Sequence, residues 1–139
     1  MITVNPYLTF NGNCFEAFNH YKKVFGGEFE AIQKFKDEPG SNHPASDANR
    51  ILHVSLPLSK GFMLMGSDRA TSMGSGSPGD NISLSLNATS KKEADDVFKG
   101  LSDSGTVTMA MATTFWGSYF GMVTDKFGIQ WMVSFAETR

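Results

Sequence analysis

The sequence predicts an α+β fold in which two βαβββ modules form a curved mixed sheet around a cavity. Both halves of the 139-residue chain begin with an alternating strand pattern led by asparagine, at Asn5–Phe10 and Asn81–Leu86. Both halves also end with a methionine that follows a glycine by four residues, at Met65 and Met132. This repeated order predicts two copies of one unit, each with a helix covering one face of the sheet.

The first half opens with a half-buried strand and a helix. Over residues 4–10 apolar side chains alternate with side chains that face the other way, which is typical of a strand with one buried face. The buried pair is Leu8 and Phe10, and the opposite pair is Tyr7 and Thr9. Residues 15–25 carry apolar side chains at helical spacing, and Gly26 and Gly27 are suited to end the helix.

Three further strands are expected before the first half ends. Phe29, Ile32 and Phe35 indicate a second strand, and the long segment 37–49 has no periodicity, so it is a candidate lid. Residues 51–58 alternate strongly, with His53 and Ser55 on the face opposite the leucines. A turn at residues 59–61 leads to the strand 62–65. The Gly- and Ser-rich segment 67–80 then has the composition of a linker between modules.

The second half repeats this order of elements. Ile82, Leu84 and Leu86 alternate with Ser83 and Ser85, and Ser90 with Glu93 fits a capping box at the start of a helix. Strands are expected at residues 106–113, after residues 115–120, and at 129–135. The sequence therefore predicts one domain over residues 1–139, with an internal repeat of 1–68 and 80–139 joined by the linker.

Composition excludes several classes of function. The chain has 40% hydrophobic residues, 19% charged residues and a net charge of −2, with Lys and Arg scattered, so we expect no nucleic-acid partner. No apolar run is long enough to span a bilayer and the N-terminus has no leader pattern, so we expect a cytoplasmic protein that does not bind membranes. Cys14 is the single cysteine, which excludes an intrachain disulfide and indicates a small buried thiol.

Several short segments together resemble the vicinal oxygen chelate superfamily (glyoxalase, bleomycin resistance protein and dioxygenase), and within it the PhnB-like group. They are Tyr7–Gly12, Glu16–Ala17, Tyr21–Lys22, Val24–Glu28, Ile51–His53, Gly66–Asp68, Phe115–Gly117 and Asp125–Trp131. The resemblance covers nearly the whole chain and implies the glyoxalase/bleomycin resistance-like fold. Members often carry the name of a demethylubiquinone methyltransferase, but no Gly-rich nucleotide turn follows a predicted strand here.

The resemblance also implies where a metal would sit. Metal-dependent relatives hold a divalent ion with a His, Gln or Glu at the start of each first strand and a Glu on each last strand. The corresponding residues in this sequence are Asn5, Asn81, Met65 and Met132. Neutral amides and soft thioethers are poor ligands for Mg²⁺, Mn²⁺ or Zn²⁺, so the sequence predicts neither a metal nor another cofactor.

Alternation places a set of side chains on the face that would line the cavity. The candidate ligand-binding residues are Tyr7, Thr9, His53, Met65, Ser83, Ser85, Trp116, Tyr119, Phe120 and Met132. His53 is the one histidine expected on the inner face of a strand, which makes it the candidate catalytic base. An apolar and aromatic lining with a few polar groups is typical of a site for a small organic molecule. Simple core packing of the same residues is the alternative.

Three functions remain open at this point. The leading interpretation is a metal-free small-molecule-binding protein that acts as a sequestering or accessory domain and forms a homodimer. The resemblance supports it, because resistance-type relatives bind their drug in a dimer cleft without chemistry. A second is a lyase or isomerase that uses His53 as base, or an atypical metal site formed by His53 and the 37–50 segment. A third is an interaction module whose cavity is closed by aromatic packing.

Overall fold

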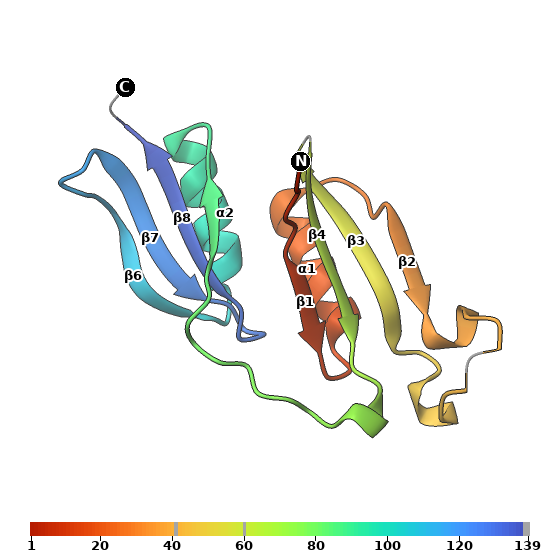
Figure 1. The fold of residues 1–139 in the computed structure, drawn as a ribbon. Coiled ribbons are helices and arrows are strands. Elements are labelled where there is room, and N and C mark those ends of the chain that lie inside the picture. Colours follow the sequence, from red (N-terminus) through yellow and green to blue (C-terminus); the bar gives the residue numbers. More distant parts are fainter. Residues whose placement is uncertain (41, 60, 138–139) are drawn as a thin grey trace. The chain divides into compact units, whose positions relative to one another are not determined.

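The computed structural model describes residues 1–40, 42–59 and 61–137. The chain divides into two compact units, residues 1–77 and residues 78–139, called unit 1 and unit 2. Figure 1 colours unit 1 from red to green and unit 2 from green to blue. Among the described residues, no helix has both the length and the apolar character needed to cross a membrane.

Unit 1 is a four-stranded mixed sheet with one α-helix. Its elements are β1 (Tyr7–Phe10), α1 (Cys14–Phe25), β2 (Ala31–Lys34), β3 (Ile51–Ser59) and β4 (Phe62–Asp68). The strand order is β1-β4-β3-β2, in which β1 runs parallel to β4 and the other pairs are antiparallel. Lys60, which belongs to the turn expected between β3 and β4, lies outside the described residues.

Unit 2 has the same topology. Its elements are β5 (Leu84–Asn87), α2 (Lys91–Ser102), β6 (Thr106–Thr113), β7 (Ser118–Thr124) and β8 (Gln130–Ala136). The strand order is β5-β8-β7-β6, with β5 parallel to β8. The expected α+β fold with two βαβββ modules and mixed sheets is therefore confirmed. The second strand is shorter than predicted, because Phe29 precedes β2 and Phe35 begins the 3₁₀ helix η1 (Phe35–Asp37).

Each helix packs on one face of its own sheet, and a glycine in the sheet admits an aromatic ring of the helix. Phe18 of α1 is completely buried, and a Cβ atom on Gly66 of β4 would lie only 2.5 Å from its ring. In unit 2, a Cβ atom on Gly121 of β7 would lie 2.9 Å from the ring of Phe98. Close packing of this kind leaves no room for a side chain at either glycine.

A buried carboxylate ties together the three segments that meet at the end of β4. Asp68 is 5% exposed. Its Oδ1 accepts hydrogen bonds from the backbone N–H groups of Gly12 (2.8 Å) and Cys14 (3.0 Å), and its Oδ2 accepts from Ile51 N–H (2.8 Å). The carboxylate thereby satisfies an otherwise unpaired donor at the start of α1 and fixes the first residue of β3.

Unit 2 uses a buried carboxylate in its last turn. Asp125, 3% exposed, accepts hydrogen bonds at Oδ1 from the N–H groups of Phe127 (2.9 Å) and Ile129 (3.0 Å). Its Oδ2 accepts from the indole N–H of Trp131 at 2.8 Å. Asp125 thus stabilises the turn before β8, and the same side chain also holds the buried tryptophan of β8 in place.

The described part of the segment 37–49 is anchored rather than unattached. It contains a second 3₁₀ helix, η2 (Ala45–Asp47), and the side chain of Asp47 is fully buried. Asp47 Oδ2 accepts hydrogen bonds from the backbone N–H and the hydroxyl of Thr71, both at 3.0 Å, at the start of η3 (Thr71–Met73). Its Oδ1 lies 3.4 Å from Arg50 Nε, an ion-pair distance without hydrogen-bond geometry.

The capping box expected at the second helix takes a slightly different form. Ser90 Oγ accepts from Glu93 N–H at 3.0 Å, as predicted. Glu93 Oε1 reaches back to the N–H of Thr89 at 2.8 Å instead of the N–H of Ser90. Both side chains still satisfy donors at the helix start, which stabilises α2.

We predict that Asp68→Asn destabilises unit 1 by about 2–4 kcal/mol, because one amide NH₂ group would face backbone donors that now bind a carboxylate. Hydrogen exchange should show faster exchange at Cys14 and Ile51. The control is Asp96→Asn, which removes an exposed carboxylate that pairs with Lys92 on α2. Equal effects of the two substitutions on unit 1 would contradict the structural role of Asp68.

We also predict that the thiol of Cys14 lowers the folding stability of the protein as the pH becomes alkaline. Burial, and to a lesser extent the neighbouring Asp68 carboxylate, raise the pKa of its thiol strongly. The stability gained by keeping this thiol neutral in the folded state is fully present below the ordinary thiol pKa. It is lost as pH rises above that value, because only the thiol of the unfolded chain ionises there. Urea unfolding between about pH 7 and pH 10 should show a smaller alkaline loss in Cys14→Ala than in the wild type.

Candidate functional site

The sheet of unit 1 has one face that its helix does not cover, called here the open face of unit 1. Tyr7 of β1 pairs with Met65 of β4, which pairs with Ser55 of β3. Strand alternation places these side chains opposite Gly66 and Val54, which face α1. Thr9 pairs with Ser67, and continuation of the β3–β4 ladder brings His53 beside Ser67. Tyr7, Thr9, His53 and Met65 therefore share one face.

Tyr7 and His53 form the most defined contact on this face. The Tyr7 hydroxyl lies 3.3 Å from His53 Nδ1, and the two rings stack with centroids 5.8 Å apart at an interplanar angle of 28°. In the tautomer protonated at Nε2, Nδ1 accepts a hydrogen bond from the Tyr7 hydroxyl, and Nε2–H remains available as a donor. Since Tyr7 is 47% exposed, the pair is accessible from outside the unit.

Unit 2 has an equivalent uncovered face, the open face of unit 2, which is rich in methionine. Met109 pairs with Met122, and Met122 pairs with Met132, so three thioethers lie in one row across β6, β7 and β8. Ser85 of β5 continues the row because it pairs with Met132. Phe120 lies on the same face of β7, two residues from Met122.

Trp116 lies in the turn between β6 and β7. Its ring packs edge-on against Phe120, with centroids 6.0 Å apart, and against Phe115 at 5.0 Å. The side chain is 58% exposed, so it is not part of the core. Of the residues predicted for unit 2, the structure therefore brings together Ser85, Phe120 and Met132 on one face, with Trp116 at its border.

Tyr119 was predicted for the wrong face. It pairs with Phe135 in the row of side chains that also holds the buried Val133, and that row faces α2. Its hydroxyl donates to Asp95 Oδ1 at 2.6 Å, and this hydrogen bond raises the pKa of the phenol. Lys91 lies over the ring at 4.6 Å. Because neighbouring strand residues face opposite sides, Tyr119 and Phe120 cannot both face outward.

The predicted correspondence between the two asparagines is also wrong. Tyr7 pairs with Met65 and Ser85 pairs with Met132, so the equivalent of Asn5 in unit 2 is Ser83, two residues beyond Asn81. Asn5 Oδ1 accepts from Met63 N–H at 3.2 Å, just before β1 begins. A shift of two residues preserves the face, so the face predicted for Ser85 is unaffected, whereas Ser83 lies just before β5.

Met65 and Met132 do occupy equivalent places. Each lies on the last strand of its unit, half-buried on the open face and paired with the first strand. In the described ranges 1–40, 42–59 and 61–137, no group of three or more His, Cys, Asp or Glu side chains could hold a metal ion. The chemistry of this donor set is therefore neutral and soft, and it does not fit a hard divalent ion.

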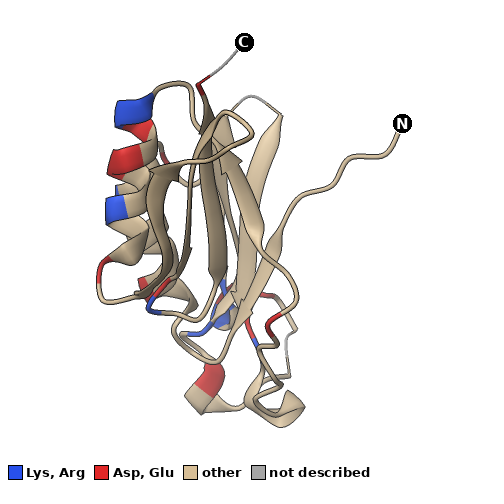
Figure 2. Cartoon of the chain, turned by 90° about the vertical axis from the view of Figure 1, so that its left-hand side faces the viewer, with Lys and Arg blue, Asp and Glu red and all other residues tan. Residues whose placement is uncertain are grey.

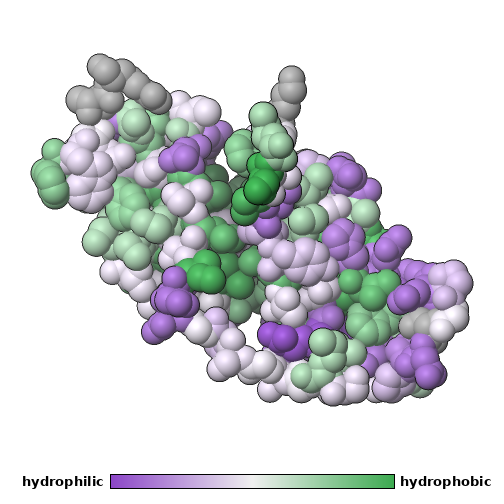
Figure 3. Space-filling view, viewed as in Figure 1, coloured by the Kyte–Doolittle hydropathy of each residue, from purple (hydrophilic) through white to green (hydrophobic). Residues whose placement is uncertain are grey.

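Charge is distributed very unevenly over unit 2. Its four strands contain no Asp, Glu, Lys or Arg, whereas α2 alone carries six such residues, Lys91, Lys92, Glu93, Asp95, Asp96 and Lys99. Figure 2 shows the coloured charged residues on α2 beside uncoloured strands. Apolar and weakly polar side chains predominate over these strands in Figure 3. A charged group bound on this face would meet no side chain of opposite sign from the strands.

Two residues near the open face of unit 1 were not predicted. Ser67 follows Met65 by two residues on the same face, and strand alternation alone could have identified it. Arg69 comes directly after β4 and lies in a segment whose composition suggested a plain linker. The sequence signal that could have identified Arg69 is its positive charge directly after a strand whose outward-facing residues are uncharged.

Comparisons with known proteins agree with this architecture. Residues 2–134 match the family model described as 3-demethylubiquinone-9 3-methyltransferase. The chain is 31% identical to Protein YjdN of Escherichia coli (strain K12) over 140 aligned positions, which cover 94% of this chain and 93% of that protein.

Solved structures give the same result. Protein PA1353 from Pseudomonas aeruginosa is 40% identical with a TM-score of 0.88, covering 99% of this chain and 100% of that one. A putative 3-demethylubiquinone-9 3-methyltransferase, PhnB protein, from Bacillus cereus is 26% identical with a TM-score of 0.76, covering 97% and 100%. A glyoxalase-related enzyme from Fulvimarina pelagi shares the fold at 16% identity and a TM-score of 0.65, covering 97% and 88%. The chain therefore belongs to the PhnB-like 3-demethylubiquinone-9 3-methyltransferase family, and it shares the fold of glyoxalase-related proteins.

Proposed function

We propose that the protein binds a small organic molecule without a metal ion, through side chains on the open faces of its sheets. The observation that carries the proposal is the Tyr7–His53 pair, whose hydroxyl and imidazole lie 3.3 Å apart on a face that the helix leaves uncovered. A buried pair of this kind would be explained by core packing. An accessible pair offers directional polar contacts to a ligand carbonyl or hydroxyl.

The surroundings of the pair support a small organic ligand. Met65 lies beside Tyr7 in register, and thioether side chains adapt to irregular apolar shapes. Considered by itself, the open face of unit 2 carries Met132, Phe120 and the exposed ring of Trp116, which suit an apolar or planar guest. Such a combination of apolar surface and few polar groups resembles small-molecule sites in general.

An enzymatic role of lyase or isomerase type is the second candidate. It is favoured by the same contact, because a hydrogen bond between the Tyr7 hydroxyl and Nδ1 orients the His53 ring. In the opposite tautomer, His53 Nε2 is the free acceptor and could remove a proton from a bound substrate. Tyr7 would then accept the hydrogen bond from Nδ1–H and act as a positioning residue.

Methyl transfer, which the family description names, is not proposed for this chain. Its Gly-rich segment 74–79 follows the short helix η3 and leads toward β5. Phosphate-binding turns of nucleotide sites instead connect a strand to the N-terminus of a helix. The segment therefore has the place of a connection and not of a nucleotide loop. The homodimer expected from the sequence stays a prediction.

We predict that uncharged aromatic fragments, with benzamide as the first probe, shift the methyl NMR signals of Met65 and Met132. Methionine methyls suit this test because the chain has eight, distributed over both units. Met73, which is 71% exposed in η3, is the internal control and should not respond. Tyr7→Phe and His53→Ala should weaken the Met65 response by about threefold to thirtyfold, in line with a lost hydrogen bond.

The outcomes separate the candidate functions. Shifts confined to Met73 and Met1, or no saturable shift for any fragment of such a screen, would count against small-molecule binding on these faces. If a binding fragment is also converted chemically, His53→Ala should abolish conversion while leaving binding measurable. A stoichiometric transition metal in protein purified without chelator would overturn the metal-free proposal.

A further inference from the structure

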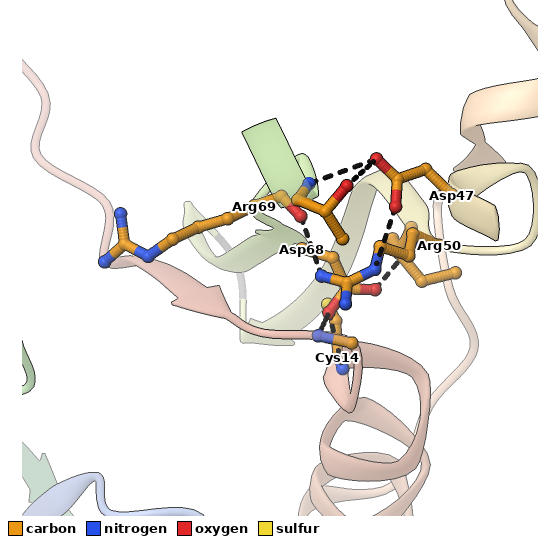
Figure 4. Close-up of polar contacts among 8 residues, drawn as sticks. Cys14, Asp47, Arg50, Asp68 and Arg69 are labelled. Atoms are coloured by element: carbon orange, nitrogen blue, oxygen red, sulfur yellow. Dashed lines mark hydrogen bonds and ion pairs between the residues drawn. The ribbon is translucent and has the colours of Figure 1, made fainter. Parts of the chain in front are cut away.

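Arg69 extends the open face of unit 1 beyond the end of β4. Its backbone N–H donates to Phe10 O at 2.7 Å, so the β1–β4 ladder continues to this residue. Strand alternation then places its side chain on the side of Met65 and Ser67, opposite the buried Asp68. Figure 4 shows the Arg69 side chain directed away from the cluster formed by Asp47, Arg50 and Asp68.

The guanidinium of Arg69 has no protein partner in the described part of the chain. No ion pair or side-chain hydrogen bond involves it there, and its Nε atom is buried without an acceptor. The neighbouring Arg50 differs, because its Nη1 donates to Arg69 O at 2.9 Å and its Nε pairs with Asp47. An unsatisfied, partly buried guanidinium is costly, so it indicates an acceptor supplied from outside the chain.

The linker keeps this guanidinium in place. A Cβ atom on Gly76 would lie 2.4 Å from Arg69 Nη2 and 2.6 Å from its central carbon, so the guanidinium lies directly against the linker backbone and a side chain at residue 76 would push it aside. Gly76 also has a φ of +64°, a backbone conformation that residues with a side chain rarely adopt. The linker is further tied to unit 1 by the hydrogen bond from Asn11 Nδ2 to Ser75 O at 2.9 Å. The guanidinium of Arg69 therefore lies against a linker segment that is attached to unit 1.

We propose that Arg69 binds an anionic group, such as a carboxylate or phosphate, of the molecule that unit 1 takes up. A planar guanidinium suits the paired oxygens of such a group. The backbone of Ser67 and of its partner Thr9 lies two residues, about 7 Å, along the strands from Arg69, so a small ligand bound at Arg69 can extend to their hydroxyls. The inference rests on the proposed function for the rest of the ligand, while the anion site is testable by itself.

The open-face residues of β1, β3 and β4 carry no fixed charge that would compete for the anion or repel it. Asp68 of β4 faces the helix, and its two carboxylate oxygens accept hydrogen bonds from backbone N–H groups of unit 1. A ligand with an anionic end at Arg69 and an uncharged polar group near His53 matches this distribution. The proposed ligand class is thus an organic anion, which differs in charge from a neutral aromatic compound of the same shape.

The test compares benzoate with benzamide, which have nearly the same shape but differ in charge. In protein labelled with ¹⁵N at arginine, benzoate should shift the Arg69 Nε–H signal saturably, and inorganic phosphate should compete with it. Benzamide should leave that signal in place. A benzoate shift that is not saturable, or that benzamide reproduces, would overturn the anion site.

Variants locate the effect on the guanidinium. Arg69→Gln should weaken benzoate binding at least about tenfold and Arg69→Lys by less, because lysine keeps the charge but loses the planar fork. Lys23→Gln removes an exposed cation of α1 and is the matched control for net charge. Gly76→Ala should act like Arg69→Gln, whereas Gly74→Ala, with φ +75° and no atom within 4 Å of an added Cβ, should not.

The result is independent of the wider proposal. If benzamide shifts Met65 while benzoate leaves Arg69 unchanged, small-molecule binding holds and the anion site fails. If benzoate binds Arg69 saturably and no fragment affects Met65, the anion site holds and the proposed function fails. Loss of benzoate binding in Lys23→Gln to the same degree as in Arg69→Gln would show a general charge effect and overturn the assignment.

Discussion

The carboxylate of Asp68 is the interaction on which the arrangement of unit 1 depends. Its two oxygens accept hydrogen bonds from three backbone N–H groups. These belong to the turn after β1, to the first residue of α1 and to the first residue of β3. These bonds fix where the helix and the central strand begin. Since strand faces alternate, the starting residue of β3 also decides that His53 faces away from the helix. The Tyr7–His53 pair is thus a consequence of a buried carboxylate on the other side of the sheet.

Unit 2 reaches the same topology with a different polar anchor. Asp125 lies in the turn before β8, where it binds two backbone N–H groups and the indole of Trp131. It thereby fixes where β8 begins and places Met132 on the side of the sheet that faces away from the helix. Asp68 does the same for β3 and His53. The two units share a strand order and a helix position, but their polar anchors are not equivalent by position. The repeat conserves the faces of the sheets more strictly than the contacts that establish them.

Much of this could be predicted from alternation and helical spacing, because both are local properties of the chain. The faces of Tyr7, His53 and Met65 follow from strand phase, and an error of two residues in matching Asn81 to Asn5 left the face unchanged. Tyr119 was misjudged because the phase of β7 depends on where that strand begins after Gly117, which local composition does not show. Arg69 was missed for another reason. Its importance comes from contacts with Gly76 and from the lack of an acceptor in the described residues, and neither is visible in spacing.

The unpaired state of Arg69 has a structural cause. The two acidic residues closest to it in the network of Figure 4 already have partners, since Asp68 accepts three backbone N–H groups and Asp47 accepts Thr71 and pairs with Arg50. Moving either carboxylate toward Arg69 would leave buried donors unsatisfied, at a cost of about 1–3 kcal/mol for each group. The contacts that position α1, β3 and η3 therefore use the nearby negative charge, and they leave the positive charge of Arg69 without a partner among the described residues. An anion from outside the chain can satisfy this guanidinium without disturbing the anchors of the fold.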